Sequence, residues 1–217
     1  MPLFGGISEP ELSAITEALR WRRYKRGEAI YRQEDPPGSL YIVAKGLLKV
    51  CLETPTGRQF TTNWIRPGNF FGLISVLDDQ ARLADAISIE ASELLLWPRE
   101  AFLVFLESHP DKCRYVLELT ANRWRSTMSR LYDLAFLDVP GRIAKTLLTL
   151  ADQRESPGEE AIALTNITHS ELAAFIGTSR ESTSRWIRTF EAAGLVRVQK
   201  GTIEIVDEAG LRSRINS

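Results

Sequence analysis

Five polar residues near the C-terminus have the types and the spacing of a surface that reads base pairs. They are Arg180, Glu181, Ser184, Arg185 and Arg188, and helical periodicity places them on one side of a helix. A guanidinium can donate to both acceptors of guanine, and a carboxylate can accept from the amino group of cytosine. The cluster therefore predicts a helix that enters the major groove of double-stranded DNA.

Capping residues on either side of a glycine predict two helices joined by a tight turn. Thr168 can cap the first helix, and Glu171, three residues later, completes a capping box. Gly177 can end this helix, because glycine adopts the left-handed conformation at little cost. Ser179 then caps the helix that carries the polar cluster. This order predicts a helix-turn-helix, in which Thr168 and Ser179 also suit contacts to phosphate.

Apolar residues give each predicted helix a buried side. Leu172, Phe175 and Ile176 fall on one face of the first helix. Trp186 and Ile187 give the second helix its buried side. A solvated amphipathic helix with ordinary surface charges would have the same spacing, so the spacing alone leaves both interpretations open. The segment that follows favours DNA binding.

Two short segments of alternating apolar and polar residues, 195–199 and 202–206, follow the helix-turn-helix. Lys200 and a glycine stand between them as a two-residue turn, which favours a β-hairpin. A helix-turn-helix followed by a short hairpin is a winged helix. In this arrangement we expect Arg197 and Lys200 to lie near a phosphate backbone.

The composition is that of an ordinary globular protein. The chain has 217 residues, a hydrophobic fraction of 44%, a charged fraction of 25% and a formal net charge of -1. Any basic surface for DNA must therefore be local. No apolar run is long enough to span a membrane, and the N-terminus lacks a signal-peptide pattern, so we expect a cytoplasmic protein with no membrane partner.

Few residues could support other chemistries. Cys51 and Cys113 are the two cysteines, too few for a disulfide framework, a metal cluster or an iron–sulfur cluster. His109 and His169 are the two histidines, and both are expected at the surface, which disfavours haem ligation. The sequence has no phosphate-binding glycine loop and no nucleophile–base set, so we predict that the protein is not an enzyme.

Short apolar segments alternate with turns in the N-terminal half. The segments expected to be strands are 29–31, 39–43, 47–52, 60–65, 84–89 and 94–97, after a small helix at 9–20. Glycine, proline and aspartate separate these segments at regular intervals. Short strands with regular turns predict a β-sandwich or a jelly roll that extends to about residue 108.

A single long helix is predicted at residues 110–136. Its apolar residues follow steps of four and three, which is the spacing of a heptad seam: Leu117, Ala121, Trp124, Met128, Leu131 and Ala135. A helix packed on its own domain is the alternative, but the sustained repeat favours pairing with a second copy. We therefore predict a homodimer whose two recognition helices lie about 34 Å apart, as a palindromic site requires.

Three segments carry motifs that can be compared with a known family. Residues 134–144 read LAFLDVPGRIA, residues 40–46 read LYIVAKG, and residues 67–72 read PGNFFG. Together they resemble the hinge and the sensor signatures of the cyclic AMP receptor protein and fumarate-nitrate reduction regulator (CRP/FNR) family of bacterial transcription regulators. The resemblance implies an α+β fold in three parts: an N-terminal double-stranded β-helix (jelly-roll) sensor domain at 1–108, a dimerisation helix and hinge at 109–137, and a C-terminal winged helix-turn-helix at 138–217.

The resemblance also implies roles for residues of the DNA-binding part. Arg180, Glu181 and Arg185 match the base-reading positions of the cyclic AMP receptor branch, which implies a TGTGA-like half-site. His169 and Gln199 stand where family members contact the DNA backbone. The polar loop at residues 153–160, before the helix-turn-helix, lies where family activators touch RNA polymerase, which is therefore an expected partner.

The segment that resembles the family's phosphate cassette departs from it at two positions. In the family, a glycine precedes a glutamate that binds a ribose hydroxyl, and an arginine that pairs with the cyclic phosphate precedes a hydroxyl residue. Here the first pair is Gly72 and Leu73, and the second is Arg82 and Leu83, with a loop one residue shorter. Leucine accepts no hydrogen bond, so a nucleotide would lose two contacts worth about 1–3 kcal/mol each.

Two further features of this pocket bear on the effector. The family's adenine-facing threonine–serine pair reads Thr127 and Met128, and three acids make the neighbourhood less favourable for phosphate: Asp78, Asp79 and Asp85. Arg82 itself could be an anion ligand or a solvated loop arginine. We hypothesise that the small-molecule or nucleotide effector, if there is one, is not cyclic AMP bound in the usual mode. The alternatives are a cyclic-nucleotide-responsive regulator that binds through Arg82, and a ligand-binding regulatory subunit that acts on a protein partner.

Overall fold

Two compact units make up the chain in a computed structural model, which describes residues 2–152, 163–164, 168–199 and 202–215. The first unit is Met1–Arg125, and the second is Ser126–Ser217. Each unit has its own sheets and its own buried apolar residues.

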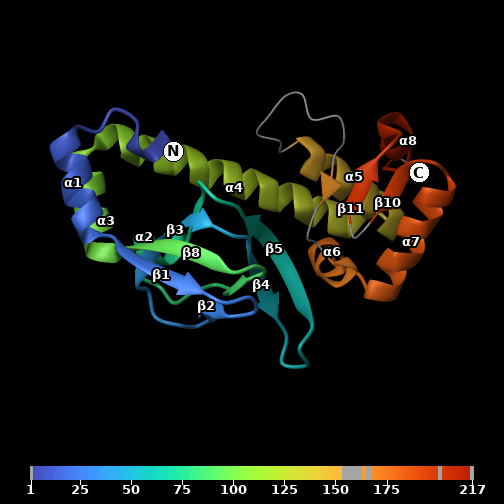
Figure 1. Cartoon of the computed structure of the whole chain (residues 1–217), viewed down its shortest axis with the longest axis horizontal. Helices are drawn as coiled ribbons and strands as arrows, with labels where there is room; N and C mark the ends of the chain where they lie inside the picture. The colour runs from blue at the N-terminus through green and yellow to red at the C-terminus, as the bar shows by residue number, and fades with distance from the viewer. Residues whose placement is uncertain (1, 153–162, 165–167, 200–201, 216–217) are drawn as a thin grey trace. The chain divides into compact units, whose positions relative to one another are not determined.

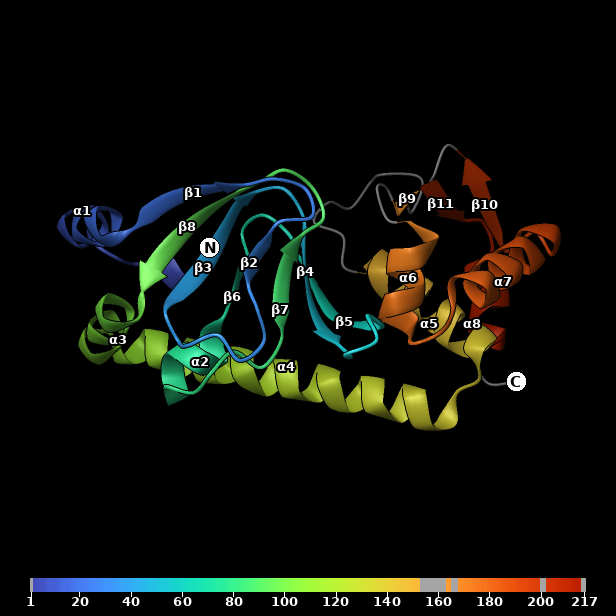
Figure 2. The ribbon, with the colours of Figure 1, turned by 90° about the horizontal axis from the view of Figure 1, so that it is seen from below.

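Two four-stranded antiparallel sheets form the body of the first unit (Figure 1). The first sheet has the order β1 (Arg20–Tyr24), β8 (Ser92–Pro98), β3 (Ser39–Lys45) and β6 (Phe70–Phe71). The second sheet has the order β2 (Ala29–Tyr31), β7 (Asp85–Ser88), β4 (Leu48–Glu53) and β5 (Gln59–Ile65). Figure 2 shows that strands far apart in the sequence lie side by side, such as β1 with β8 and β7 with β4. This arrangement confirms the predicted jelly roll.

Alternation along the strands divides the apolar residues of the first unit between two clusters. On β3, Tyr41 and Val43 belong to a cluster that draws on both sheets, whereas Leu40 and Ile42 belong to a cluster shared with helices. Those helices are η1 (Pro2–Phe4), α1 (Glu9–Ala18), α2 (Leu73–Asp78) and α3 (Arg99–Ser108). The helices therefore cover the outer face of the first sheet, and the space between the sheets is lined mainly by aromatic and branched side chains.

The longest helix is α4 (Pro110–Phe136), as the heptad pattern predicts. It begins with a proline, whose fixed φ and missing N–H suit the first turn of a helix. Val116, in its second turn, is buried in the cluster that the first sheet shares with helices. In the part of the chain that the structure describes, no helix combines the length and the apolarity needed to cross a lipid bilayer.

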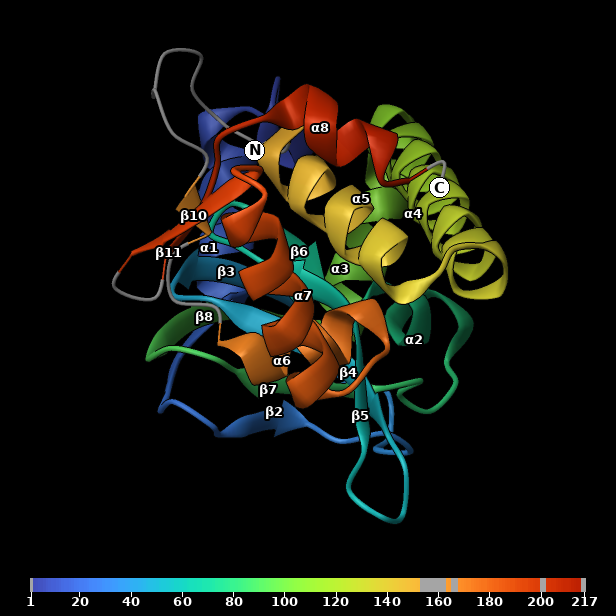
Figure 3. The ribbon, with the colours of Figure 1, turned by 90° about the vertical axis from the view of Figure 1, so that its right-hand side faces the viewer.

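The second unit is a winged helix-turn-helix, as predicted. Its helices are α5 (Val139–Asp152), α6 (His169–Ile176), α7 (Arg180–Ala192) and α8 (Glu208–Ser213). Its antiparallel sheet has the order β10 (Val196–Gln199), β11 (Thr202–Ile205) and β9 (Ala163–Leu164). Helix α5 contacts α6, α7 and α8 (Figure 3), and the buried apolar residues of these helices include Ile143, Leu147, Leu172, Ile187, Phe190 and Leu211. With the jelly roll, this unit confirms the α+β fold class.

Several elements of the first unit differ from the expectation, and the strands β1 and β6 and the short helix α2 lie outside the predicted strand segments. The leading helix ends at Ala18, because Arg20 already pairs with Leu96 in β1. The helix α3 was not predicted, although Phe102 and Phe105 recur at helical spacing and bury against Trp97 at centroid distances of 5.1 and 5.0 Å.

The expectation that His109 is a surface histidine is wrong. Its side chain is only 17% exposed, and its ring stacks on Phe105 with the centroids 4.5 Å apart. Nδ1 lies 2.8 Å from the carbonyl oxygen of Phe105, and Nε2 lies 3.2 Å from a carboxylate oxygen of Glu11. His109 therefore joins α1 to the end of α3 as a packing residue.

Candidate nucleic-acid interface

The helix-turn-helix begins with the predicted capping box. The backbone N–H of Glu171 donates to the Thr168 hydroxyl at 3.2 Å, and the backbone N–H of Thr168 donates to the Glu171 carboxylate at 2.8 Å. Two N–H groups that the first turn leaves without helical partners are thereby satisfied. The start of α6 is therefore fixed by its own sequence.

The turn between α6 and α7 follows the predicted signals. Gly177 has φ 76° and ψ 45°, the left-handed conformation that ends α6 and that side-chain-bearing residues rarely adopt. Ser179 then caps α7, since its hydroxyl accepts from the backbone N–H of Ser182 at 3.1 Å. The residue after this cap is Arg180, which places the polar cluster at the very start of α7.

One side of α7 is buried in the second unit. Thr183, Ile187 and Phe190 are at most 1% exposed and recur at steps of four and three. Trp186, which we expected on the buried side, is only half-buried and lies 6.3 Å from Phe190 between ring centroids. The burial of these residues fixes the rotation of α7 about its axis, and hence which residues it presents to solvent.

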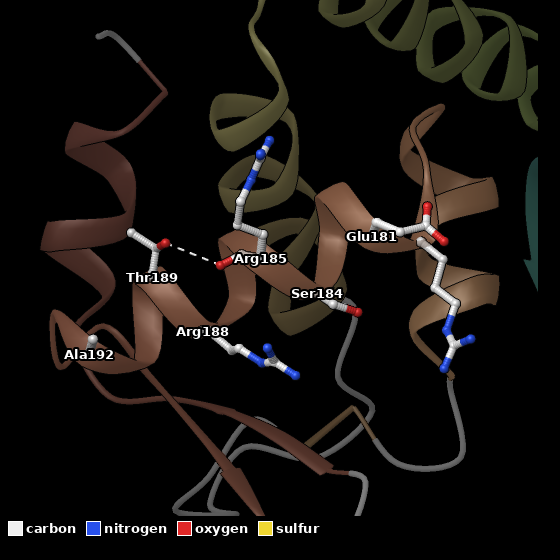
Figure 4. Close-up of a pocket in the computed structure, with 7 residues that line it drawn as sticks. Glu181, Ser184, Arg185, Arg188, Thr189 and Ala192 are labelled. Carbon is white, nitrogen blue, oxygen red and sulfur yellow. Dashed lines mark hydrogen bonds between the residues drawn. The ribbon is translucent and has the colours of Figure 1, made fainter.

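The opposite side of α7 forms a hollow that is open to solvent (Figure 4). The five residues of the predicted cluster line it together with two others: Arg180, Glu181, Ser184, Arg185, Arg188, Thr189 and Ala192. Figure 4 shows the guanidinium groups of Arg185 and Arg188 extending away from each other. Within residues 2–152, 163–164, 168–199 and 202–215, none of the three arginines forms an ion pair. Their donors are therefore available to a ligand.

Glu181 lies in the first turn of α7, where backbone N–H groups favour negative charge. Its pKa is lowered because its own backbone N–H and the Ser179 side chain hydrogen-bond to the carboxylate, and the nearby Arg180 adds to the effect. The carboxylate is therefore ionised at neutral pH and can act only as an acceptor, which suits the amino group of cytosine.

His169 connects the start of α6 to the polar cluster. Its Nδ1 lies 2.9 Å from the hydroxyl oxygen of Ser184, within hydrogen-bond distance. Its side chain is half-buried rather than fully exposed. The structure thus brings His169 and Ser184 together, and Ser184 lines the hollow that carries the arginines.

The wing is the predicted hairpin. Gln199 pairs with Thr202 at its tip, while Lys200 lies outside the described residues. Arg197 was expected near a phosphate backbone, but its guanidinium pairs with Glu204 on the neighbouring strand at 3.0 Å. Gln199 is exposed, which leaves its amide available to a ligand.

Replacing Thr168 tests how far the capping box supports this surface. Thr168→Ala should lower the free energy of unfolding of the second unit by about 1 kcal/mol, because it removes the cap acceptor and one side of the capping box. Chemical denaturation of the DNA-free protein, followed by circular dichroism, measures this. Ser170→Ala, an exposed position in the same turn, is the matched control. Equal midpoints for the two variants would contradict the role of the cap.

A second candidate site lies in the first unit, around Arg82. Its side chain is buried, with 2% of the residue exposed, which excludes the alternative of a solvated loop arginine. Nη1 donates to the carbonyl oxygen of Gly72 at 2.9 Å, and Nη2 donates to that of Ser39 at 2.8 Å. The guanidinium also lies over the rings of Tyr31 and Tyr41, 4.4 and 5.6 Å from their centroids.

The glycine of this cassette is required by the arginine. Gly72 has φ +80°, and a Cβ on it would lie 2.7 Å from Nη1 of Arg82. The two leucines do not join Arg82: Leu73 is buried among apolar residues and Leu83 is 60% exposed. The cassette therefore offers one buried guanidinium, already bonded to two carbonyls, and neither of the two polar side chains that the family's mode requires.

The neighbouring acids and phenols are less repulsive to an anion than the sequence suggests. Asp85 pairs with Arg32 at 2.7 Å, and Asp79 pairs with Arg99 at 3.2 Å. Burial raises the pKa of Tyr31 to about 12, so its ring stays neutral over the physiological range. Two of the three acids near the cassette, Asp79 and Asp85, are therefore paired with arginines.

The remaining predicted pocket and seam residues lie on α4. Thr127 and Met128 follow Arg125, the last residue of the first unit, and both are exposed. The seam residues are exposed along the whole helix: Leu117 at 69%, Trp124 at 66%, Leu131 at 53% and Met128 at 46%, with Ala121 and Ala135 also exposed. Within the described chain, this apolar stripe is not covered by the unit to which each residue belongs.

Three arginines that the sequence analysis did not single out also hold parts of these sites. Arg123 donates to the carbonyl oxygen of Phe70 at 2.7 Å and lies over its ring. Arg130 and Arg142 bind carbonyl oxygens at the end of α6. Their partners are backbone atoms far away in the sequence, and no local spacing rule indicates such contacts.

Neither cysteine has the environment of a reactive thiol. Cys51 is fully buried, and this burial raises the pKa of its thiol. Cys113 is half-buried, with its sulfur 3.4 Å from the carbonyl oxygen of Leu106. Reactive cysteines are exposed and have a lowered pKa, so the buried Cys51 acts here as a packing residue.

Two family models match the chain. The cyclic nucleotide-binding domain matches residues 21–109, and the Crp-like helix-turn-helix domain matches residues 141–214. The solved structure of FixK2 from Bradyrhizobium japonicum has the same fold, with a TM-score of 0.81 and 19% identity over 90% of this chain and 96% of that one.

Curated relatives match over nearly their whole length. The chain is 34% identical to the cyclic AMP receptor protein of Thermus thermophilus, over 96% of this chain and 94% of the relative. It is 30% identical to the CRP-like cAMP-activated global transcriptional regulator of Mycobacterium tuberculosis, over 98% of this chain and 95% of the relative. The chain therefore belongs to the CRP/FNR family of transcription regulators, with a cyclic nucleotide-binding domain followed by a Crp-like helix-turn-helix.

Proposed function

We propose that this regulator acts as a homodimer that binds a palindromic, TGTGA-like DNA site. The observation that carries the proposal is the exposed side of α7, where Arg180, Arg185 and Arg188 form no ion pair with any described residue and line the same hollow as the ionised Glu181. Buried Ile187 and Phe190 keep this side turned outward. Guanidinium groups at the start of a recognition helix are the commonest readers of guanine.

The residues of this surface divide into two roles. Arg180, Glu181 and Arg185 read base edges, since they match the base-reading positions of the cyclic AMP receptor branch. The remaining polar residues bind the sugar–phosphate backbone and fix the register of α7 on the duplex: Thr168, His169, Ser179, Ser184, Arg188, Gln199 and Lys200.

The dimer forms through the apolar stripe on α4. The stripe keeps a heptad spacing over residues 117–135, and its larger side chains are 46–69% exposed within the chain. Pairing with a second copy of α4 would bury it, because the same stripe on both helices is self-complementary about a two-fold axis. In this proposal the sensor domain is residues 1–108, the dimerisation helix and hinge are residues 109–137, and the winged-helix DNA-binding domain is residues 138–217.

The effector is where this chain departs from relatives named for cyclic AMP. Leu73 is buried in an apolar cluster, Leu83 is exposed, and Arg82 is bonded to two carbonyls. We infer that the protein binds DNA without cyclic AMP and that any nucleotide binds in another mode. The protein acts in the cytoplasm, contacts RNA polymerase as part of transcription control, and has no enzymatic role.

Fluorescence anisotropy tests this function and the effector together. The full-length protein should bind a TGTGA-N6-TCACA duplex more tightly than a scrambled duplex at fixed salt, and added cyclic AMP should leave both affinities unchanged. Specific binding only in the presence of cyclic AMP would overturn the effector part and favour a nucleotide-responsive regulator. Equal affinity for both duplexes under both conditions would overturn sequence-specific binding.

Isothermal titration with cyclic AMP separates the two effector interpretations. We expect no micromolar binding, because the two leucines remove contacts worth about 1–3 kcal/mol each. Micromolar or tighter binding that Arg82→Ala abolishes would contradict this. Leu83→Ser, which restores one hydroxyl at an exposed position, is the matched gain-of-contact variant and should strengthen whatever weak binding exists.

A further inference from the structure

The C-terminal end of α6 is held by two arginines from other helices of the second unit. Nη2 of Arg130, on α4, donates to the carbonyl oxygen of Phe175 at 2.7 Å. Nε of Arg142, on α5, donates to the carbonyl oxygen of Ile176 at 3.2 Å. The last carbonyls of a helix lack helical donors and carry the negative end of its dipole, so cations satisfy them well.

Arg130 makes a second contact that Arg142 does not. Its guanidinium lies over the ring of Phe175, 4.0 Å from the centroid. One N–H and the flat face of the guanidinium are thus used on one residue, which fixes its position more closely than a single hydrogen bond would. Burial lowers the pKa of Arg130 to about 10, which leaves it charged at neutral pH.

The contact joins the helix that carries the seam to the turn that precedes the reading residues. Leu131, next to Arg130, belongs to the apolar stripe, and Phe175 is five residues before Arg180. Between them stand only the end of α6 and the Gly177 turn. A second contact joins α4 to the rest of the second unit. It is the ion pair between Asp133 and Lys145 at 2.5 Å, and it reaches α5 and not α6.

We propose that Arg130 is a positioning residue for DNA recognition, which ties the end of α6 to α4 and so sets the distance of each recognition helix from the dimer seam. The proposal rests on the function proposed above, since it requires a dimer that reads two half-sites. A palindrome is read only when both helices meet the groove at the right separation. Arg130 therefore acts on the preference for one half-site spacing, through Phe175, without touching DNA.

The test measures this spacing preference. The full-length protein and its variants are titrated by anisotropy with the TGTGA-N6-TCACA duplex and with a duplex whose spacer is two base pairs longer. Arg130→Gln should reduce the ratio of the two affinities by about tenfold, since loss of the stacked, bonded guanidinium is worth roughly one such factor. Phe175→Leu should act in the same direction, and Phe175→Tyr, which keeps the ring, should behave as the wild type.

Lys145→Gln is the matched control. It breaks the neighbouring link between α4 and α5, and it should change stability without changing the spacing preference. Circular dichroism and denaturation midpoints show whether each variant is folded. Arg130→Lys keeps the charge but loses the planar guanidinium, so it provides a milder change than Arg130→Gln.

The outcomes separate this inference from the proposed function. If the wild type shows no preference for the TGTGA duplex over scrambled DNA, both the proposed function and the role of Arg130 are overturned. If the wild type prefers the N6 spacing and a folded Arg130→Gln keeps the whole preference, only the role of Arg130 is overturned. A loss of preference in Lys145→Gln as large as in Arg130→Gln would also overturn it, because the effect would then follow from general loosening of the unit.

Discussion

Arg180→Ala is expected to weaken binding to a TGTGA-like duplex by about 1–3 kcal/mol and to leave binding to scrambled DNA nearly unchanged. Arg180 is the first residue of α7, directly after the Ser179 cap, and its side chain lines the exposed hollow. It is not buried, and it forms no ion pair with any described residue, so its removal should cost the fold little. Anisotropy titrations with the two duplexes at one salt concentration measure the effect.

Lys200→Ala is the control for this prediction. Lys200 is assigned to the phosphate backbone, so its loss should weaken binding to both duplexes alike and reduce the dependence of the affinity on salt. If Arg180→Ala weakens binding to both duplexes by the same factor, Arg180 binds the backbone and the base-reading role is wrong.

The features of the winged helix-turn-helix that the sequence predicted are those fixed by residues close together in the chain. The capping box joins Thr168 to Glu171, and the Ser179 cap joins residues three apart. The wing hairpin depends on a two-residue turn between alternating segments. Each of these features is decided within one or two turns of backbone, where residue preferences act directly.

The contacts that the sequence did not predict join residues that are distant in the chain. Arg82 binds the carbonyl of Ser39, 43 residues away, and His109 contacts Glu11, 98 residues away. Arg130 reaches Phe175 across 45 residues. A backbone carbonyl is present at every residue, so no residue type marks it as a partner. Only the fold decides which arginine meets which carbonyl.

The difference between local and long-range contacts also explains why the sequence predicted the DNA-binding surface better than the pocket around Arg82. The polar cluster assigned to base reading lies on one helix, α7, so periodicity alone could group its residues. The pocket around Arg82 is assembled from β2, β3, the start of α2 and the loop before β7, and its leucines behave differently: Leu73 enters an apolar cluster and Leu83 faces solvent. The resemblance to the family located the cassette, but it could not tell that the Arg82 guanidinium lies over the rings of Tyr31 and Tyr41.

Trp124→Glu is expected to convert the dimer into monomers at micromolar concentration. Trp124 is 66% exposed within the chain and stands in the middle of the apolar stripe on α4. Tryptophans at the centre of an interface commonly contribute about 2 kcal/mol or more to the binding free energy. Because of the two-fold axis, the substitution is present in both subunits, so the dimer dissociation constant should rise by about a thousandfold. Sedimentation equilibrium measures this directly.

Asn122→Glu is the matched control, because it adds the same charge about 200° around the helix from Trp124, at an exposed position outside the stripe. It should remain dimeric. The DNA consequence follows from the two-fold arrangement: a monomer reads one half-site, so Trp124→Glu should bind the palindrome no more tightly than a duplex with a single TGTGA. A Trp124→Glu protein that stays dimeric and keeps its preference for the palindrome would show that the seam lies elsewhere, and that the heptad spacing of α4 serves packing within its own chain.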